Sequence, residues 1–234
     1  MDHTKLSKRL HQAGTYIPKG AVLADIGSDH AYLPAYLYLN EKMSRGIAGE
    51  VVTGPFESAK HLVTTLGITD AIDVRLGDGL DVVSLADEVT AISICGMGGS
   101  LIRDILDRGA KGGRLSGKER LVLQPNIGEP TLRQWLVAHQ YAIVAEEILE
   151  ENDKRYEIIV AEKSDKPVAL TPRELLFGPH LVREKSDIFK EKWQQELQQR
   201  RYVLKQIKQS DKDNRVKQAE FEEQIRMIEE VLES

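Results

Sequence analysis

Short apolar runs alternate with amphipathic segments over the first two thirds of the chain, and this alternation constrains the fold most strongly. The apolar runs, rich in Val and Ile, are residues 21–27, 45–51, 72–78, 91–97 and 120–126. Between them, residues 56–67, 100–109 and 130–140 carry apolar side chains at helical spacing. Strands that alternate with helices of this length indicate βαβ units and a parallel sheet. Because the strands are apolar almost throughout, we expect helices on both faces of the sheet.

A predicted antiparallel hairpin closes this sheet. The runs AIVAEEILEE (142–151) and RYEIIVAEK (155–163) flank the turn residues Asn152 and Asp153. Five βα units followed by a hairpin is the usual order of Rossmann-like methyltransferases, whereas a plain doubly wound dehydrogenase has less reason to end this way. The predicted fold class is therefore α/β, with a Rossmann-like sheet of the class I methyltransferase type in residues 1–166.

Residues 167–234 form a second predicted domain. From about Arg183 the chain contains no glycine or proline, and apolar positions recur at spacings of three and four residues on both sides of the break 210–214. The spaced positions are Trp193, Leu197, Arg200, Leu204 and Ile207, then Phe221, Ile225, Ile228 and Leu232, all apolar except Arg200. The pattern predicts an α-helical, coiled-coil-like hairpin. Two roles for this helical arm are open: packing or dimerisation, and binding of a substrate.

Composition narrows the class of protein. No apolar run approaches 18 residues and no secretory signal is evident, so we expect a protein without a membrane association. The single cysteine, Cys95, excludes an internal disulfide and a thiolate metal site and suits a reducing, cytoplasmic compartment. No metal site and no obligate protein partner is evident. The net charge of -5 argues mildly against a protein that coats nucleic acid, although basic residues cluster at 5–9 and 108–120.

Acidic residues follow successive predicted strands. In an open α/β sheet, ligands bind at the carboxyl ends of the strands. Glu50 ends the second strand, 25 residues after Asp25, where an acid can accept both hydroxyls of a ribose. Asp78 ends the third strand and can accept a hydrogen bond from an adenine amino group, while Gly79 lets the backbone approach closely. Together these positions predict a nucleoside site.

The turn after the first strand distinguishes between nucleoside cofactors. A pyrophosphate is bound by the pattern G-x-G-x-x-G, whereas this turn has one glycine, Gly27, among Asp25, Asp29 and His30. Carboxylates repel a diphosphate but attract a sulfonium and an ammonium group. The turn therefore favours S-adenosylmethionine (AdoMet) over NAD as the cofactor.

Five sequence blocks together resemble one known family. The blocks ADIGSDHAYLP, GIAGEVVTGPFESA, RLGDGL, ISICGMGG and LVLQPN, in residues 24–126, resemble the bacterial tRNA (adenine-N1)-methyltransferases of the TrmK family. The resemblance implies AdoMet-dependent methylation of N1 of an adenine at position 22, in the D-arm region of tRNA. It also implies the cofactor-binding positions, which are Asp25, Gly27, His30, Glu50, Asp78, Gly79, Cys95 and Gly96.

The chemistry of adenine N1 suggests catalytic candidates. The N6 amino group becomes acidic as charge develops on the ring, so a nearby acceptor or base assists the reaction. We expect Asp29 and Asn126 to be catalytic, although Asp29 alternatively caps a helix and orients His30. Cys95 is expected to act as a small apolar residue, since no step needs a thiolate. The predicted substrate-binding residues are Lys5, Arg9, Met97, Gly98 and Gln124.

Two other functions remain open from the sequence. The first is an AdoMet-dependent methyltransferase that acts on another RNA or on a small molecule. The second is a non-catalytic AdoMet-binding protein whose helical arm recruits partners. The presence of all three acids, Asp25, Glu50 and Asp78, argues against the second, because a site that no longer supports catalysis has no need of them.

Overall fold

The computed structural model describes residues 2–209 and 214–233, which divide into two compact units. The first unit is Met1–Leu170 and the second is Thr171–Ser234. The boundary expected from the sequence, between residues 166 and 167, falls just before this division. Each unit is considered by itself below. Within the described ranges, none of the helices has both the length and the apolar character needed to cross a bilayer.

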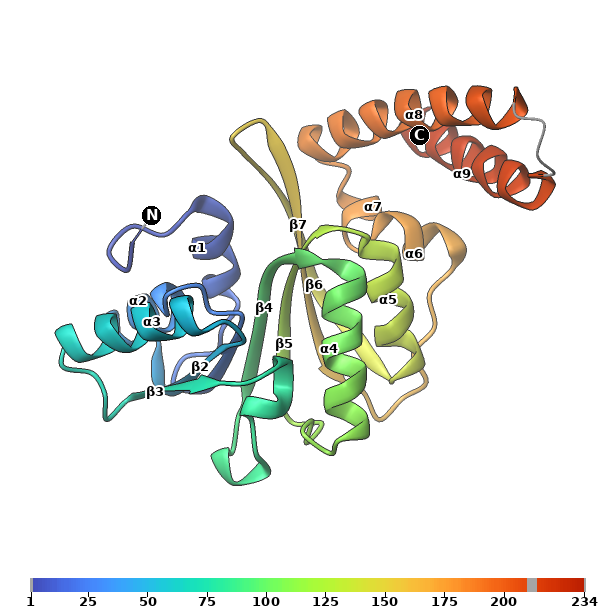
Figure 1. The fold of residues 1–234 in the computed structure, drawn as a ribbon. Helices are drawn as coiled ribbons and strands as arrows, with labels where there is room; N and C mark the ends of the chain where they lie inside the picture. The colour runs from blue at the N-terminus through green and yellow to red at the C-terminus, as the bar shows by residue number, and fades with distance from the viewer. Residues whose placement is uncertain (1, 210–213, 234) are drawn as a thin grey trace. The chain divides into compact units, whose positions relative to one another are not determined.

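A seven-stranded mixed sheet forms the centre of the first unit (Figure 1). Its strands are β1 (Ala21–Ile26), β2 (Met43–Glu50), β3 (Ile72–Leu76), β4 (Ala91–Gly98), β5 (Arg120–Ile127), β6 (Tyr141–Glu151) and β7 (Lys154–Lys163). The order is β3-β2-β1-β4-β5-β7-β6. The first five strands are parallel, and β7 runs antiparallel to both β5 and β6. The predicted Rossmann-like sheet with a closing hairpin is therefore confirmed.

Helices cover both faces of this sheet, as the apolar strands predicted (Figure 1). On one face lie α1 (Lys8–Thr15), α2 (Tyr32–Leu39) and α3 (Thr53–Thr65), and on the other lie α4 (Gly99–Lys111) and α5 (Glu129–Ala138). Successive side chains of a strand point to opposite faces, so Leu23 packs in the first core and Ala24 in the second. Two short 3₁₀ helices, η1 (Gly79–Val82) and η2 (Leu85–Asp87), connect β3 to β4.

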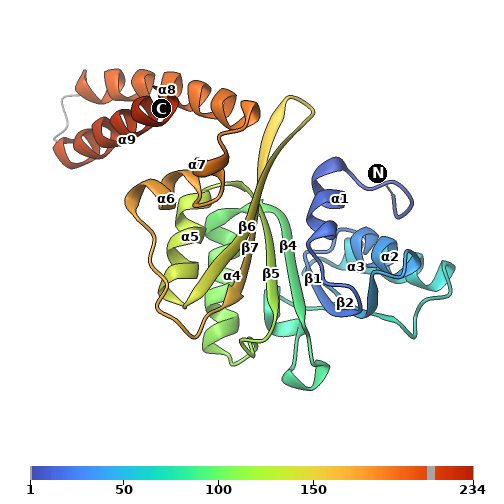
Figure 2. The same ribbon diagram turned by 180° about the vertical axis from the view of Figure 1, so that it is seen from behind.

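The β6–β7 hairpin extends past the carboxyl ends of the parallel strands (Figure 2). Its turn residues Asn152 and Asp153 both have positive φ angles, 52° and 58°, which a tight two-residue hairpin turn requires. The hairpin also fastens the N-terminal helix. Tyr16 Oη and Gln12 Nε2 each donate a 2.8 Å hydrogen bond to Glu147 Oε2, and Lys8 Nζ donates to the Glu150 carbonyl. These bonds hold the start of α1 at the carboxyl edge of the sheet.

A buried ionic cluster joins α5 to the hairpin. The Arg133 side chain on α5 is fully buried and pairs with Glu146 on β6 and with Glu157 on β7. Its Nε donates a 2.9 Å hydrogen bond to Glu146 Oε1. Charges taken out of water are tolerated only when they are paired in good geometry. The cluster therefore links three elements beneath the projecting hairpin.

The second unit is helical. It contains α6 (Pro172–Phe177), α7 (Leu181–Glu184), α8 (Asp187–Lys208) and α9 (Arg215–Glu233). Ion pairs between Arg201 and Glu229 and between Lys208 and Glu222 place α8 and α9 antiparallel. Two helices thus lie where the spacing predicted them, while the coiled-coil description of their packing stays a prediction. Of the expected break 210–214, all but the last residue lies outside the described residues.

Candidate active site

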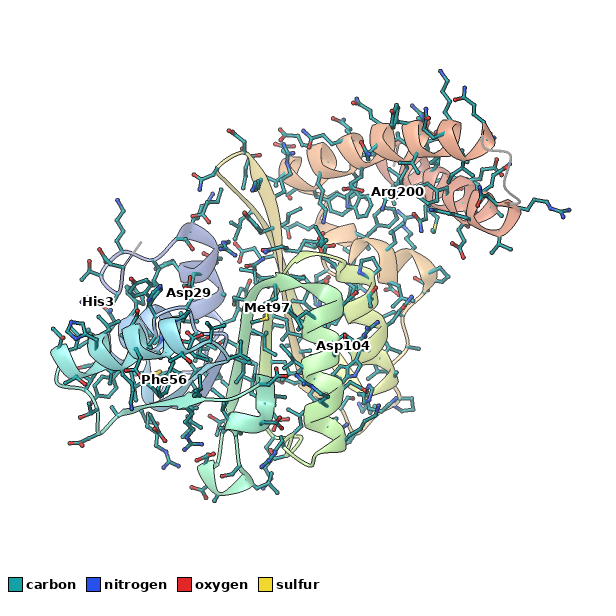
Figure 3. The ribbon with its side chains drawn as sticks, in the orientation of Figure 1. His3, Asp29, Phe56, Met97, Asp104 and Arg200 are labelled. Carbon is teal, nitrogen blue, oxygen red and sulfur yellow. The ribbon has the colours of Figure 1, made fainter. Side chains whose placement is uncertain are left out.

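A cleft of about 230 Å³ opens at the carboxyl ends of β1 and β4. The sheet order reverses between these two strands, which is where open α/β sheets bind ligands. Three segments line it: Ser7, Arg9 and Leu10 at the start of α1, the loop from Asp25 to Asp29, and Cys95–Met97 at the end of β4. In Figure 3, Asp29 and Met97 mark two of these segments.

The loop after β1 has an unusual backbone. Gly27 has a φ of 68°, and the three consecutive residues Asp29, His30 and Ala31 have φ angles of 47°, 70° and 58°. Non-glycine residues in this left-handed region are disfavoured and persist only where surrounding contacts enforce them. Here the Gly27 and Ser28 amides donate to the Gly49 carbonyl at 2.9 and 3.2 Å. Strain of this kind clusters at functional sites.

Asp29 does not cap the following helix. The residue before α2 is Ala31, and no side chain caps that helix. The alternative role considered for Asp29, a helix N-cap, is therefore wrong. Instead the Asp29 carboxylate lines the cleft, is two-thirds exposed, and lies 3.4 Å from His30 Nε2.

Asp25 is the buried anchor of the loop. Ser28 Oγ and Ser93 Oγ donate hydrogen bonds of 2.6 and 2.5 Å to its two carboxylate oxygens. Burial raises the pKa of Asp25, and these two hydrogen bonds oppose the rise. Ser93 was not singled out from the sequence, although a lone hydroxyl in the apolar run AISIC was the available signal. The pair Ser93–Asp25 connects β4 to the loop.

Glu50 adds a second buried carboxylate at the end of β2. The His30 backbone amide donates a 3.3 Å hydrogen bond to Glu50 Oε1. Burial raises the pKa of Glu50, and the negative charges of Asp25 and Asp29 raise it further. Asp25 and Asp29, which line the cleft, and Glu50, which does not, thus repel one another. A cation bound among them would relieve that repulsion.

The opposite wall of the cleft is the turn at the end of β4. Gly96 has a φ of 76°, and a Cβ built there would lie 3.2 Å from Arg9 Nη1. Burial raises the pKa of the Cys95 thiol well above its usual range, which favours the neutral thiol over the thiolate. A Cβ at Gly27 would lie 2.2 Å from Met97 Cε, so the two walls approach closely at that point.

Gln124 organises this wall from behind. Its Oε1 accepts hydrogen bonds from Arg9 Nη1 at 2.8 Å and from the Gly96 amide at 3.1 Å. Its Nε2 donates to the Pro125 carbonyl and to Asn126 Oδ1, and the side chain is fully buried. Asn126 Nδ2 in turn donates to the Gly96 carbonyl at 2.8 Å. The Gln124 side chain therefore lies behind the cleft wall. Arg9 lines the cleft, whereas Asn126 is exposed beside the Gly96 turn and does not line the cleft.

Comparison with known proteins identifies the family. A family model described as "TrmK: tRNA (adenine(22)-N(1))-methyltransferase" matches residues 23–230. The chain belongs to the TrmK family. The tRNA (adenine(22)-N(1))-methyltransferase of Bacillus subtilis is 47% identical over 239 aligned residues, which cover 100% of this chain and 99% of the relative.

Solved TrmK structures share the whole fold. The crystal structure of B. subtilis TrmK superposes with a TM-score of 0.91, covering 98% of this chain and 99% of the relative. Streptococcus pneumoniae Sp1610 in complex with S-adenosyl-L-methionine is 42% identical, with a TM-score of 0.88 over 97% of this chain and all of that one. Mycoplasma capricolum TrmK in complex with S-adenosyl-homocysteine is 28% identical, with a TM-score of 0.84 over 97% and 98%. The resemblance inferred from the sequence blocks is confirmed.

Four of the positions expected from the TrmK blocks do not line the cleft: His30, Glu50, Asp78 and Gly79. Asp78 forms a two-pronged ion pair with Arg108, at 2.6 and 2.8 Å, and the hydrogen bond from Arg108 lowers the pKa of Asp78. A Cβ at Gly79, which has a φ of 59°, would lie 3.0 Å from the Ile105 side chain on α4. The cofactor role of all four residues stays a prediction.

The predicted substrate-binding residues differ in their distance from the cleft. Lys5 is exposed and does not line the cleft, and Gly98 is the residue before α4. Arg9, by contrast, reaches the cleft and also stacks over Tyr156 at 5.1 Å. Tyr156 was not predicted as a site residue. Among the described residues of this TrmK-family chain, no cluster of three or more His, Cys, Asp or Glu side chains could hold a metal ion.

Proposed function

We propose that this chain transfers a methyl group from AdoMet to N1 of adenine 22 in tRNA. The observation that carries the proposal is the cleft between β1 and β4, where Asp25 and Asp29 face a turn held by Arg9 and Gln124. The chain is also related to the B. subtilis enzyme over its full length. The cofactor follows from the family and from the charge of the site.

The residues of the cleft fit AdoMet. Asp25 and Asp29 in the cleft, with Glu50 close enough to interact electrostatically with both, gather negative charge, which suits a ligand bearing a sulfonium and an ammonium group. Glu50 stands at the end of β2, where an acid accepts ribose hydroxyls. When bound, AdoMet supplies an electrophilic methyl group on its sulfonium. Solved relatives hold S-adenosyl-L-methionine or S-adenosyl-homocysteine.

The chain's own residues position the adenine and accept a hydrogen bond from its N6 amino group. Adenine N1 is a weak nucleophile, so much of the rate enhancement comes from orientation. Asp29 is exposed at the cleft and accepts a hydrogen bond from the N6 amino group as that group becomes acidic. Asn126, fixed by Gln124 and the Gly96 carbonyl, offers a second polar contact to the base. Because N1 is engaged when adenine pairs, the base must leave its stack first.

Contacts with the tRNA body come from basic residues outside the cleft. Lys5 and Lys8 are exposed beside Arg9, at the N-terminal edge of the cleft, and suit phosphate groups. In the second unit, α8 has 22 residues and is therefore about 33 Å long, a length suited to lie along a tRNA arm. We place the enzyme in the cytoplasm as a tRNA-processing protein that needs no partner protein.

Incubation with total bacterial tRNA and labelled AdoMet, followed by nucleoside analysis, tests the proposal. Label in 1-methyladenosine, mapped to position 22, is the expected result. Label in another nucleoside, or in a small molecule, would identify a methyltransferase with a different substrate. AdoMet binding without any transfer would identify a non-catalytic AdoMet-binding protein and would overturn the proposal.

A further inference from the structure

Ile127 presents an apolar side chain to solvent at the edge of the active site. It is the last residue of β5 and is 72% exposed, whereas Leu123 in the same strand is fully buried. No large apolar side chain among the described residues of the first unit is more exposed. Apolar surface of this size is unfavourable in water and gains free energy when a ligand covers it.

The backbone under Ile127 is tightly fixed, so its exposure does not come from a loose loop. Ile127 pairs with Gly98 in the β4–β5 ladder. A Cβ at Gly99 would lie 2.3 Å from the Gly128 carbonyl oxygen and 3.0 Å from that of Ile127. The turn after β5 therefore packs backbone to backbone against the start of α4, and it holds Ile127 in one place.

Ile127 is also continuous with the cleft. The preceding residue, Asn126, donates its side-chain hydrogen bond to the carbonyl of Gly96, and Gly96 lines the cleft wall. A rigid apolar side chain thus stands one residue beyond a polar contact proposed for the target base. Ile127 therefore lies near the proposed position of the target base.

An enzyme that methylates adenine N1 in a structured arm must take the base out of its stack. Proteins that unstack nucleic acids frequently insert an apolar wedge, such as Ile, Leu, Phe or Met, between neighbouring bases. We propose that Ile127 is such a wedge: it enters the tRNA stack at the place of adenine 22 and keeps the extruded base in the cleft. The proposal rests on the proposed function and adds a specific residue and step to it.

Kinetics on two tRNAs test the wedge. One is the intact substrate, and the other carries an abasic residue opposite adenine 22, so that the adenine leaves its stack easily. Ile127→Ala is expected to lower kcat/KM on the intact tRNA by about tenfold or more, and on the abasic tRNA by less than about twofold, since unstacking a base takes a few kcal/mol. Ile127→Met, which keeps an apolar wedge, is expected to retain most of the activity on both.

Leu85→Ala is the matched control. Leu85 is 63% exposed and lies on η2, before β4 begins and hence at the opposite edge of the sheet. It is expected to behave as wild type on both tRNAs. Equal losses by Ile127→Ala on the two tRNAs, or no loss on either, would overturn the wedge.

A fluorescent base gives a readout that does not depend on methyl transfer. With 2-aminopurine in place of adenine 22, binding of the wild-type protein is expected to raise the fluorescence as the base leaves its stack. Ile127→Ala is expected to bind this tRNA with little rise, and a full rise would contradict the proposal. If wild-type protein forms no 1-methyladenosine in the intact tRNA, the proposed function itself fails. If it does and Ile127→Ala matches it in both assays, only the wedge fails.

Discussion

Arg9 Nη1 donates a 2.8 Å hydrogen bond to Gln124 Oε1 across 115 residues of sequence. The same oxygen accepts the Gly96 amide, so one buried side chain holds both the N-terminal helix and the β4 turn at the cleft. The N-terminal segment therefore forms part of the cleft, and its attachment to Glu147 and Glu150 on the hairpin keeps it there.

This relationship predicts non-additive mutations. Arg9→Ala and Gln124→Ala are each expected to lower kcat/KM for tRNA by about tenfold or more, because a charge-assisted hydrogen bond contributes roughly 1.5–3 kcal/mol. Since both changes break one arrangement, the double variant is expected to lose little more than either single variant. Steady-state kinetics on tRNA, with the wild type, the two single variants and the double variant, measure the coupling between Arg9 and Gln124. Lys118→Ala, which removes an exposed cation before β5, is the control, and fully additive losses would contradict the coupling.

Glu50→Gln is expected to weaken AdoMet binding. The change removes a negative charge from the end of β2 while the side chain keeps its size. A lost hydrogen bond to a charged group corresponds to an increase in Kd of about tenfold to a hundredfold. Calorimetric titration measures this, with Glu57→Gln on α3, which is exposed, as the control. An unchanged Kd would show that Glu50 only supports the His30 amide.

The sheet could be predicted from the sequence because apolar runs and helical spacing are local properties. Residues 32–39 (YLPAYLYL) were not predicted as a helix, since their apolar side chains surround the axis and give no amphipathic period. The carboxylates Asp25 and Glu50 were found because the end of a parallel strand is a predictable place for a ligand. The partner of Asp78 was not, because Arg108 reaches it from another element 30 residues away. Backbone strain at 29–31 likewise depends on contacts with β2 that no local pattern encodes.

The burial of Asp25 predicts a pH-dependent stability. Because burial raises its pKa above the ordinary 3.8, the native chain keeps this proton to a higher pH than the unfolded chain does. Its contribution to stability is therefore complete below the unfolded value and is lost as the pH rises through the native value. Asp25→Asn, which does not ionise, avoids that loss.

The free energy of unfolding of Asp25→Asn, relative to wild type, is thus expected to increase between about pH 4 and pH 7. Urea titrations at the two pH values measure it. Asp81→Asn, at an exposed carboxylate on η1, provides the comparison. A difference from wild type that is the same at both pH values would contradict the prediction.

Gly99→Ala is expected to destabilise the protein where Gly98→Ala does not. The added Cβ at Gly99 would meet the Gly128 carbonyl at 2.3 Å, and this backbone contact has no flexible side chain that could yield. Overpacking of this kind costs about 1–3 kcal/mol. At Gly98 the same methyl group meets nothing within 4 Å and φ is -72°, so the change is expected to stay within about 0.5 kcal/mol. Denaturant unfolding compares the two variants, and equal stabilities would contradict the close contact between Gly99 and the Gly128 carbonyl.

Removal of the second unit is expected to abolish the methylation of tRNA without changing the binding of AdoMet. A chain ending at Leu170 should bind AdoMet as the full chain does, because the cleft residues all lie in the first unit. It should fail to methylate tRNA, because it lacks the helix α8 that we propose to lie along a tRNA arm. A cut at Arg183 would be less informative, since it divides the cluster in which Phe177 packs against Trp193 at 4.5 Å between ring centroids. Calorimetry and methyl-transfer assays give the two readouts. Unchanged methylation by the shortened chain would rule out a substrate role for α8 and α9.

The buried cluster of Arg133, Glu146 and Glu157 has an evolutionary consequence. A change at one of the three positions leaves an unpaired charge in the interior, which is expected to cost about 3–5 kcal/mol, whereas replacing the whole set by apolar residues can be neutral. Intermediate sequences that change one member at a time are therefore selected against. Among descendants of one ancestor, we expect these three positions, spread over α5, β6 and β7, to be inherited together or exchanged together.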